Sequence, residues 1–330
     1  MSGFVAGVFD ATVTASTVLI LAGLGELISE RAGVLNLGVE GIMLVGALTG
    51  VIATAITGNY WIGFFVAVLC GMLMSLIHAF LCITLKSDQA VSGIMLTLLG
   101  TGLTTYFGND WASTRISGFP QQKIPVVGDL LIEIPIAGPA LFRSTATDYM
   151  ALLLVPVVYL FLYRTNLGLE LISVGEDPET ADTMGVDVFK MRYLAVVVGG
   201  AFAGAAGAHL SLGVIQLWSP GMAAGRGWIA VALVIFAQWR PERILVGAYL
   251  FGMFDALQLY SQGLDLTLSS STPLAGTLNP ILNFVFDPQI MATYPYLATL
   301  IVLFLTVARS ENSHLAEPSG LVQPYSRETD

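Results

Sequence analysis

The sequence predicts an all-α fold, a polytopic bundle of membrane-spanning helices. Hydrophobic residues make up 55% of the 330-residue chain and charged residues only 11%. A soluble domain would carry roughly a quarter charged residues. Apolar runs long enough to cross a hydrocarbon core of roughly 30 Å recur along nearly the whole chain, so we expect one bundle of helices and no soluble domain.

About nine apolar runs have the length of spanning helices. They cover residues 10–28, 36–57, 61–85, 89–108, 148–164, 193–214, 226–239, 243–262 and 293–309. A further stretch, 276–286, is bounded by prolines and is too short to cross, which predicts a re-entrant or interfacial segment. The chain is thus divided into a transmembrane domain over 1–310 and a polar tail over 311–330.

Lysine and arginine residues in short loops predict the orientation of the bundle. If the crossings alternate, one side collects Arg31, Lys86, Arg164, Lys190, Arg192, Arg240, Arg243 and Arg309. We expect this side to be cytoplasmic, so that the N-terminus lies outside and the C-terminus inside. The long loop 109–147 is then external and the loop 165–192 is cytoplasmic.

The composition also argues against several classes of function. The formal net charge of −10 disfavours a nucleic-acid partner, which would need a basic patch. The chain shows neither a phosphate loop nor a His-Glu-x-x-His motif, and His78 and His209 are better explained by bonds to neighbouring helices than by a metal. We therefore expect no catalytic residue, no metal site and no cofactor bound by this chain.

The first informative motif, ERAGVLNLGVEG over residues 30–41, lies between two apolar runs. Its glycines permit non-helical angles or close approach, and Asn36 is a candidate cap for the helix that restarts there. Glu40 lies about one turn further on, where a carboxylate either serves function or fixes neighbouring backbone. The break at 29–35 is echoed at 219–225, a pattern typical of membrane proteins with two repeated halves.

The second motif, GEDPETADTMGV over residues 175–186, lies in the predicted cytoplasmic loop. Asp177 is a good N-cap, Pro178 suits the first helical position and Glu179 complements the positive helix end. Gly185 is placed to end the helix with a positive φ. The motif predicts a short, sharply bounded helix outside the membrane, either a well-capped connector or a contact for a soluble partner.

Small residues form one face of the sixth apolar run. Gly200, Ala203, Gly204 and Gly207 recur there at helical spacing. Such a face lets another helix approach closely, so we expect packing and not ligand binding at these positions.

With a third motif, GRGWIAVA over 225–232, these stretches resemble the permease family of ABC importers for ribose, branched-chain amino acids and nucleosides. The resemblance spans about 25–260 and is nearest to the nucleoside (simple sugar) branch. It implies a non-enzymatic subunit that passes nucleosides across a bacterial cell (inner) membrane, with ATP and magnesium bound by a separate ATPase. It also implies a second, homologous permease in a heterodimer, an extracytoplasmic substrate-binding lipoprotein, and contact with membrane lipid.

The resemblance implies site residues in two places. The short helix would contact the ATPase through Glu176, Asp177, Pro178, Glu179, Thr180, Ala181 and Gly185. A nucleoside path needs aromatic faces and neutral polar groups, and the candidates near the breaks are Asn36, Glu40, Thr97, Thr101, Gln216, Trp218, Trp228 and Asn279. Each has a plainer alternative, because Trp also anchors helices at membrane interfaces and Thr bonds to its own helix.

Two other functions stay open. An importer of a pentose or hexose sugar would use the same architecture, since an external binding protein largely sets specificity. A secondary transporter would use Glu40 and Asp255 as proton or sodium sites. The capped helix outside the membrane argues against that second alternative, because such a carrier has no ATPase to engage.

Overall fold

The computed structural model describes residues 2–112, 114–123, 143–261, 275–291 and 317–327, together with 293, 294, 296–298, 300, 301 and 304. The chain forms two compact units. One consists of Met1–Ser16, Gln122–Ser144 and Ala248–Glu311, and the other, called the large unit here, consists of Thr17–Gln121, Thr145–Gly247 and Asn312–Asp330.

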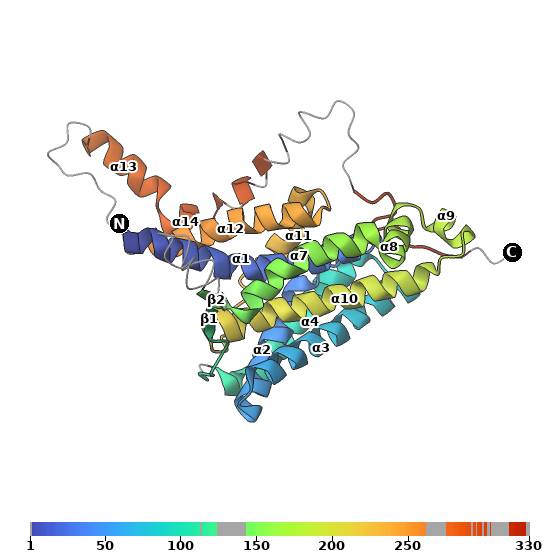
Figure 1. Ribbon diagram of the computed structural model, residues 1–330, viewed down its shortest axis with the longest axis horizontal. Helices are drawn as coiled ribbons and strands as arrows, with labels where there is room; N and C mark the ends of the chain where they lie inside the picture. Colours follow the sequence, from blue (N-terminus) through green and yellow to red (C-terminus); the bar gives the residue numbers. More distant parts are fainter. Residues whose placement is uncertain are drawn as a thin grey trace. The chain divides into compact units, whose positions relative to one another are not determined.

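Helices dominate the described chain (Figure 1). In the first half they are α1 (Ser2–Arg31), α2 (Val39–Thr57), α3 (Tyr60–Ala79) with the π-helical turn η1 (Phe80–Thr84), and α4 (Gln89–Gly108) with the 3-10 turn η2 (Asn109–Trp111). Then follow α7 (Ala146–Arg164), α8 (Asn166–Glu176), α9 (Pro178–Thr183), α10 (Val188–Ala208) with the π-helical turn η3 (His209–Ile215), α11 (Arg226–Ala237), α12 (Pro241–Ser261), α13 (Ala275–Val285) and α14 (Pro288–Met291).

Six of the described helices are long and apolar enough to cross a membrane. They cover Val5–Arg31, Val39–Thr57, Tyr60–Thr84, Gln89–Trp111, Ala146–Arg164 and Val188–Ile215, as the first six predicted runs require. The runs at 226–239 and 243–262 coincide with α11 and α12, which are not among these six, and 293–309 lies largely outside the described residues. A bundle of nine spans therefore stays a prediction.

Helices α2, α3, α4 and α10 run side by side in the large unit (Figure 1). Glycines bring their backbones together: a Cβ on Gly46 would lie 2.6 Å from the carbonyl oxygen of Gly204, and one on Gly71 would lie 2.3 Å from that of Gly200. No side chain fits at such distances. The small-residue face predicted on α10 is thus confirmed as a packing surface.

The first helix break begins later than predicted. We expected it at 29–35, yet α1 continues to Arg31 because its last charged residues have partners within the large unit. The Glu30 carboxylate accepts a hydrogen bond from Trp239 Nε1 (2.5 Å), and Arg31 donates two to the Trp239 carbonyl oxygen (2.9 and 3.1 Å). The helix ends at Arg31, and the turn that follows it contains Gly33, whose φ of +84° suits only glycine well.

The loop 165–192 contains a helix that the sequence analysis did not predict. Helix α8 starts at the N-cap Thr165, whose hydroxyl accepts a hydrogen bond from the Gly168 N–H (3.1 Å). Leu171 and Val174 are buried on its inner face. The signal was present, since this helix is amphipathic with apolar residues at helical spacing.

A two-stranded sheet of β1 (Gln121–Lys123) and β2 (Arg143–Thr145) corrects the all-α prediction at one place. Both strands lie in the predicted loop 109–147, and the residues between them lie outside the described part of the chain. Three-residue strands leave no hydropathy pattern, so the sequence could not reveal them.

The smaller unit contains the start of α1, the later part of α12, and α13 and α14. A Cβ on Gly252 would lie 2.3 Å from Ser16 Oγ, so α1 and α12 pack closely there. The predicted re-entrant stretch 276–286 is a helix, α13, with Pro280 inside it.

The glycine contacts lead to a stability prediction. Gly46→Ala places a Cβ against a backbone oxygen, and we expect this overpacking to cost about 1–3 kcal/mol. Gly102→Ala is the matched control, because Gly102 is also helical and has no atom within 4 Å of its added Cβ. Thermal unfolding of both variants in detergent measures the difference, and equal melting temperatures would contradict the packing account.

Candidate functional site

The two helix breaks singled out in the sequence meet at the side chain of Glu40. Its Oε1 accepts a hydrogen bond from the Gly225 N–H (2.8 Å) and its Oε2 accepts one from the Gly227 N–H (2.6 Å). Helix α11 begins at Arg226, so the carboxylate lies where backbone N–H groups lack partners and the helix dipole is positive. The side chain is 8% exposed, and both of its oxygens bond to backbone.

A substitution at Gly227 would break this junction. Its Cβ would lie 2.4 Å from the backbone nitrogen of Glu40. The contact favours the second alternative for Glu40, in which the carboxylate fixes neighbouring backbone. Both oxygens of the Glu40 carboxylate already accept backbone hydrogen bonds, which argues against its use as a proton or sodium site.

Asn36 lies in the turn before Glu40, but it does not cap α2 as predicted. Helix α2 begins at Val39 with Gly38 as its N-cap. The Asn36 side chain accepts a hydrogen bond from the Gly38 N–H (2.9 Å), two residues on, and its own N–H donates to Glu26 Oε1 (2.7 Å). The prediction was wrong because a local Asx turn competes with the cap for the same oxygen.

The two threonines proposed for the substrate path bond to backbone. Thr97 donates from its hydroxyl to the Leu37 carbonyl oxygen (3.0 Å), which ties α4 to the turn before α2. Thr101 donates to the Thr97 carbonyl oxygen (2.8 Å) within its own helix and remains exposed. Thr101 therefore follows the plainer alternative, a bond within its own helix, whereas Thr97 bonds to a backbone carbonyl of another segment.

Gln216 and Trp218 lie together near the far end of α4. The Gln216 carbonyl oxygen accepts a hydrogen bond from the Ile116 N–H (3.2 Å), while its side chain is exposed. Trp218 is fully buried, and a Cβ on Gly108 would lie 2.3 Å from its Nε1. The indole thus packs against the end of α4, which argues against an open stacking surface.

Three candidates remain, one on α11 and two in the smaller unit. Trp228 is partly exposed on α11, one residue after the Glu40 junction. Asn279 on α13 and Asp255 on α12 are half-buried in the smaller unit. The structure thus brings together Asn36, Glu40 and Thr97 at one place and Gln216 and Trp218 at another.

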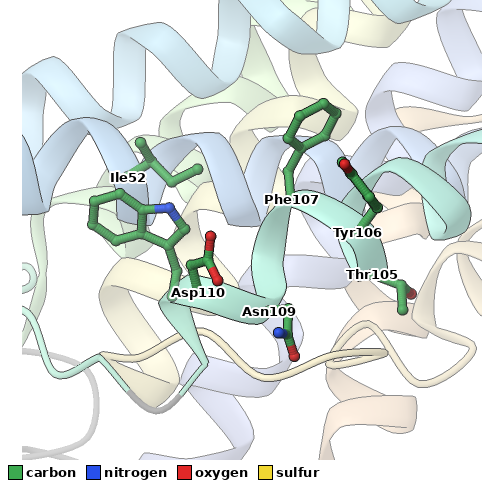
Figure 2. Close-up of a pocket in the computed structure, with 7 residues that line it drawn as sticks. Ile52, Thr105, Tyr106, Phe107, Asn109 and Asp110 are labelled. Atoms are coloured by element: carbon green, nitrogen blue, oxygen red, sulfur yellow. The ribbon is translucent and has the colours of Figure 1, made fainter.

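A cavity of 720 Å³ opens beside α2, α4 and η2 (Figure 2). Its described lining residues are Ile52, Thr105, Tyr106, Phe107, Asn109, Asp110 and Trp111. They combine three aromatic rings with a carboxylate, an amide and a hydroxyl. Such a set suits a ligand with an apolar face and several hydroxyls, although none of these residues was proposed from the sequence.

The short helix α9 has the caps that the sequence predicted. Asp177 accepts hydrogen bonds from the Thr180 backbone N–H (3.0 Å) and hydroxyl (2.6 Å), and Pro178 occupies the first position. These bonds hold the pKa of the Asp177 carboxyl below its usual range. The carboxylate therefore keeps its charge, and its capping bonds, at neutral pH.

The end of α9 is a Schellman motif. The Val186 N–H donates to the Ala181 carbonyl oxygen (3.0 Å), the Gly185 N–H donates to that of Asp182 (2.9 Å), and Gly185 has the predicted positive φ, at +91°. Ala181 is 4% exposed and packs inward, which corrects its proposed role as a contact for a partner.

The outward face of α9 includes a residue that the sequence analysis did not select. Glu179, Thr180 and Thr183 are exposed, and Met184 is the most accessible apolar side chain of the loop at 80%. Met184 thus presents an exposed apolar side chain directly before the glycine turn that ends α9.

The two membrane histidines bond to neighbouring helices, as predicted. His78 contacts Ser92 Oγ and the Leu35 carbonyl oxygen, both at 3.0 Å. His209 contacts Thr147 Oγ1 (2.7 Å) and Asp148 Oδ1 (3.4 Å). Over the described ranges, His, Cys, Asp and Glu form no group of three or more that could hold a metal ion.

Comparison with known families identifies the chain. A family model described as the permease component of branched-chain amino acid transport systems matches residues 8–307. The chain belongs to this family of ABC transporter permeases. It is a membrane-embedded transport component and not an enzyme, in agreement with the sequence analysis.

Three relatives illustrate the range of the family. TsgC13 of Haloferax volcanii, provisionally assigned as a glucose ABC transporter permease protein, is 68% identical over 99% of both chains. The guanosine ABC transporter permease protein NupQ of Bacillus subtilis is 32% identical over 92% of this chain and 93% of its own. TsgB13, a glucose ABC transporter permease protein of the same Haloferax strain, is 25% identical over 78% of this chain and 69% of its own.

The Glu40 junction leads to a second stability prediction. Glu40→Gln leaves one acceptor for two N–H donors, and Glu40→Ala leaves none. We expect losses of roughly 1–3 kcal/mol for Gln and more for Ala, because a buried N–H without a partner carries its full desolvation cost.

Denaturant unfolding in detergent measures both variants. Glu179→Gln makes the same chemical change on an exposed side chain and serves as the control. If Glu40→Gln unfolds at the same denaturant concentration as this control, the carboxylate does not hold the two breaks together.

Proposed function

We propose that this chain is the permease subunit of an ATP-driven importer of a hexose sugar such as glucose. The observation that carries the proposal is the 68% identity to TsgC13 over 99% of both chains. Identity of this extent over the whole chain supports a shared class of substrate. The sugar importer, an alternative in the sequence analysis, thus becomes the leading candidate.

Nucleoside import is the second candidate. The 32% identity to NupQ and the motifs around Glu40 and α9 favour it. Both substrates carry a ring with several hydroxyls, and the cavity beside α4 offers groups that would bind either (Figure 2). The purine base is the difference, because it would stack on a second aromatic face. A pentose importer shares the architecture and is a further variant of the sugar proposal.

The proposed coupling element is α9, which would fit a separate ATPase. Glu176, Asp177, Pro178, Glu179, Thr180 and Gly185 keep the roles proposed from the sequence. We add Met184 as the apolar anchor of this contact and assign Ala181 to the inner packing of the helix. The ATPase would bind ATP and magnesium, so this chain needs no cofactor of its own.

The proposed architecture extends beyond the six candidate spans. We propose nine crossings in two repeated halves, with the N-terminus outside, the C-terminus in the cytoplasm and a permease domain over 1–310 followed by a tail over 311–330. The clustering of lysine and arginine in alternate loops supports this orientation. The cell membrane is then the site of action.

We also propose two protein partners besides the ATPase. Two homologous permeases of one Haloferax strain, TsgC13 and TsgB13, both carry a glucose permease description, and this chain is similar to each. Their co-occurrence supports a second, different permease as the other half of the pore. An external binding lipoprotein would deliver the sugar and set most of its specificity.

The first test of this proposal is uptake by cells that carry the chain with its neighbouring genes. We expect labelled glucose to enter, and uptake to vanish when the partner ATPase is mutated in its phosphate loop. Labelled guanosine and ribose are measured in parallel. Uptake of guanosine without glucose would establish the second candidate, and uptake that survives the ATPase mutation would overturn the ATP-driven class.

The second test concerns α9. Gly185→Val forces a β-branched residue to a φ of +91°, and we expect uptake to fall about tenfold or more while membrane insertion stays intact. Gly58→Val is the matched control, since Gly58 also has a left-handed φ (+69°) and open space but lies between α2 and α3. Normal uptake by Gly185→Val would refute the coupling role of α9.

A further inference from the structure

The described part of the tail, residues 317–327, lies against the short helix and its neighbours. The Gly320 N–H donates to the Gly175 carbonyl oxygen (2.8 Å), at the end of α8. The Arg192 guanidinium of α10 donates to the Gln323 carbonyl oxygen (3.0 Å). The sequence analysis expected only a polar tail here, yet this segment joins the ends of two helices that flank α9.

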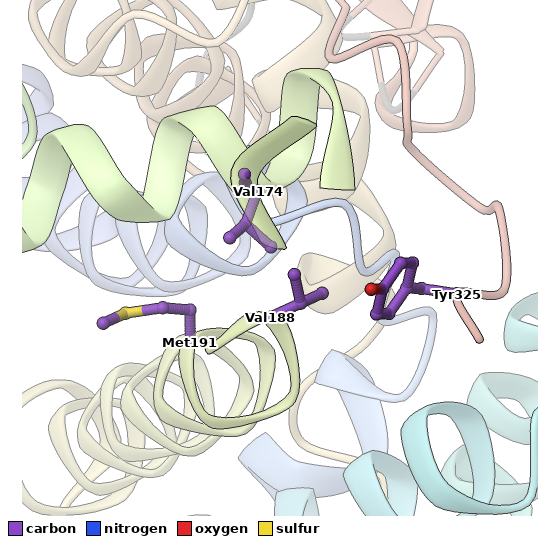
Figure 3. Packing of buried hydrophobic residues seen from close by; sticks show 5 residues of the cluster. Val174, Val188, Met191 and Tyr325 are labelled. Atoms are coloured by element: carbon purple, nitrogen blue, oxygen red, sulfur yellow. The ribbon is translucent and has the colours of Figure 1, made fainter. Parts of the chain in front are cut away.

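Tyr325 belongs to a cluster of buried residues from α8, α9 and α10, four of which are labelled in Figure 3. It is 8% exposed, and the other buried members of the cluster are Val174 of α8, Ala181 of α9, and Val188 and Met191 of α10. Its ring centroid lies 5.6 Å from that of Phe189. The inner face of α9 thus packs on a core to which the tail contributes its aromatic residue.

Arg327 binds α9 directly. Its Nε donates to Asp182 Oδ2 (2.8 Å) and its Nη2 donates to Asp182 Oδ1, a bidentate pair. The guanidinium holds the pKa of the Asp182 carboxyl below its usual range. A carboxyl with a lowered pKa loses its charge only as the pH falls through that value, so the pair is intact at neutral pH.

Helix α9 needs such support. It has only six residues, and a helix of this length does not persist by its own hydrogen bonds. Its caps define where it starts and ends, but they do not orient it relative to α8 and α10. The tail holds its inner face, while Glu179, Thr183 and Met184 remain exposed on the outside.

We propose that residues 317–327 form a clamp that holds α9 in the orientation its ATPase partner requires, with Tyr325 and Arg327 as its positioning residues. The inference rests on the proposed function of α9 as the coupling helix. It assigns to the tail a role in transmitting ATPase closure to the membrane helices, separate from insertion and from substrate binding.

The test is a charge exchange, measured as sugar uptake together with ATP hydrolysis in cells and vesicles that carry the complete transporter. Arg327→Asp and Asp182→Arg place like charges together, and we expect each to lower the maximal uptake rate roughly fivefold with an unchanged KM for the sugar. ATP hydrolysis continues, so that more ATP is consumed for each sugar imported. The double variant exchanges the positions of the two charges, so an ion pair can form again, and it is expected to recover most of the uptake rate.

Two further comparisons separate the role of the clamp from general effects of a lost ion pair and of a lost side chain. Arg240→Asp disrupts a comparable exposed pair, Arg240 with Glu242 (2.7 Å), and should leave coupling unchanged. Tyr325→Phe keeps the buried ring but loses the hydroxyl that interacts with Asp182, so it should reduce coupling less than Tyr325→Ala, which should uncouple as Arg327→Asp does. Immunoblots of membranes confirm equal insertion.

Normal uptake by both charge variants, or a double variant no better than the single ones, would overturn the clamp. Uptake by the clamp variants is compared with uptake by Gly185→Val. If that variant is inactive while the clamp variants transport normally, α9 is the coupling helix and the tail plays no part. If Gly185→Val itself transports normally, the proposed function of α9 fails, and the clamp inference fails with it.

Discussion

Close contact between helix backbones at glycine is the constraint on which the rest of the large unit depends. Lipid tails are as apolar as leucine, so burial of apolar side chains drives helix association only weakly in a bilayer, and tight packing must replace it. Glycines 46 and 71 place α2 and α3 directly on carbonyl oxygens of α10. With α2 held in this way, Glu40 points to the start of α11, and the second break is fixed to the first.

Polar side chains in the membrane helices mainly satisfy backbone groups. Glu40 accepts from two N–H groups of the α11 start, Thr97 donates to a turn carbonyl, and Asn36 closes its own turn. A backbone N–H without a hydrogen-bond partner costs free energy where water is absent. The irregular stretches of backbone therefore bond to nearby side-chain oxygens. The residues that looked most functional in the sequence are therefore those that make the helix breaks possible.

Local contacts define the ends of α9, and contacts with residues distant in sequence define its orientation. Its ends depend on adjacent residues, Asp177 and Gly185, and both were predictable because capping bonds reach only a few positions along the chain. Its orientation depends on Tyr325 and Arg327, more than a hundred residues away. The six residues of α9 thus combine capping bonds at both ends with contacts from the tail. The same division explains why Ala181, which is adjacent to exposed residues in sequence, lies inside.

The sequence by itself determined the predominantly helical class, the positions of six long apolar helices, the small-residue face of α10 and the caps of α9. Each of these follows from hydropathy, periodicity or backbone preference over a few neighbouring residues. Only the tertiary structure decided that α1 continues through Glu30, that Glu40 bonds to α11, and that the tail packs with α9. In each case the bonding or packing partner is far away in the sequence. The residues next to a given atom in the chain therefore do not indicate which partner it will have.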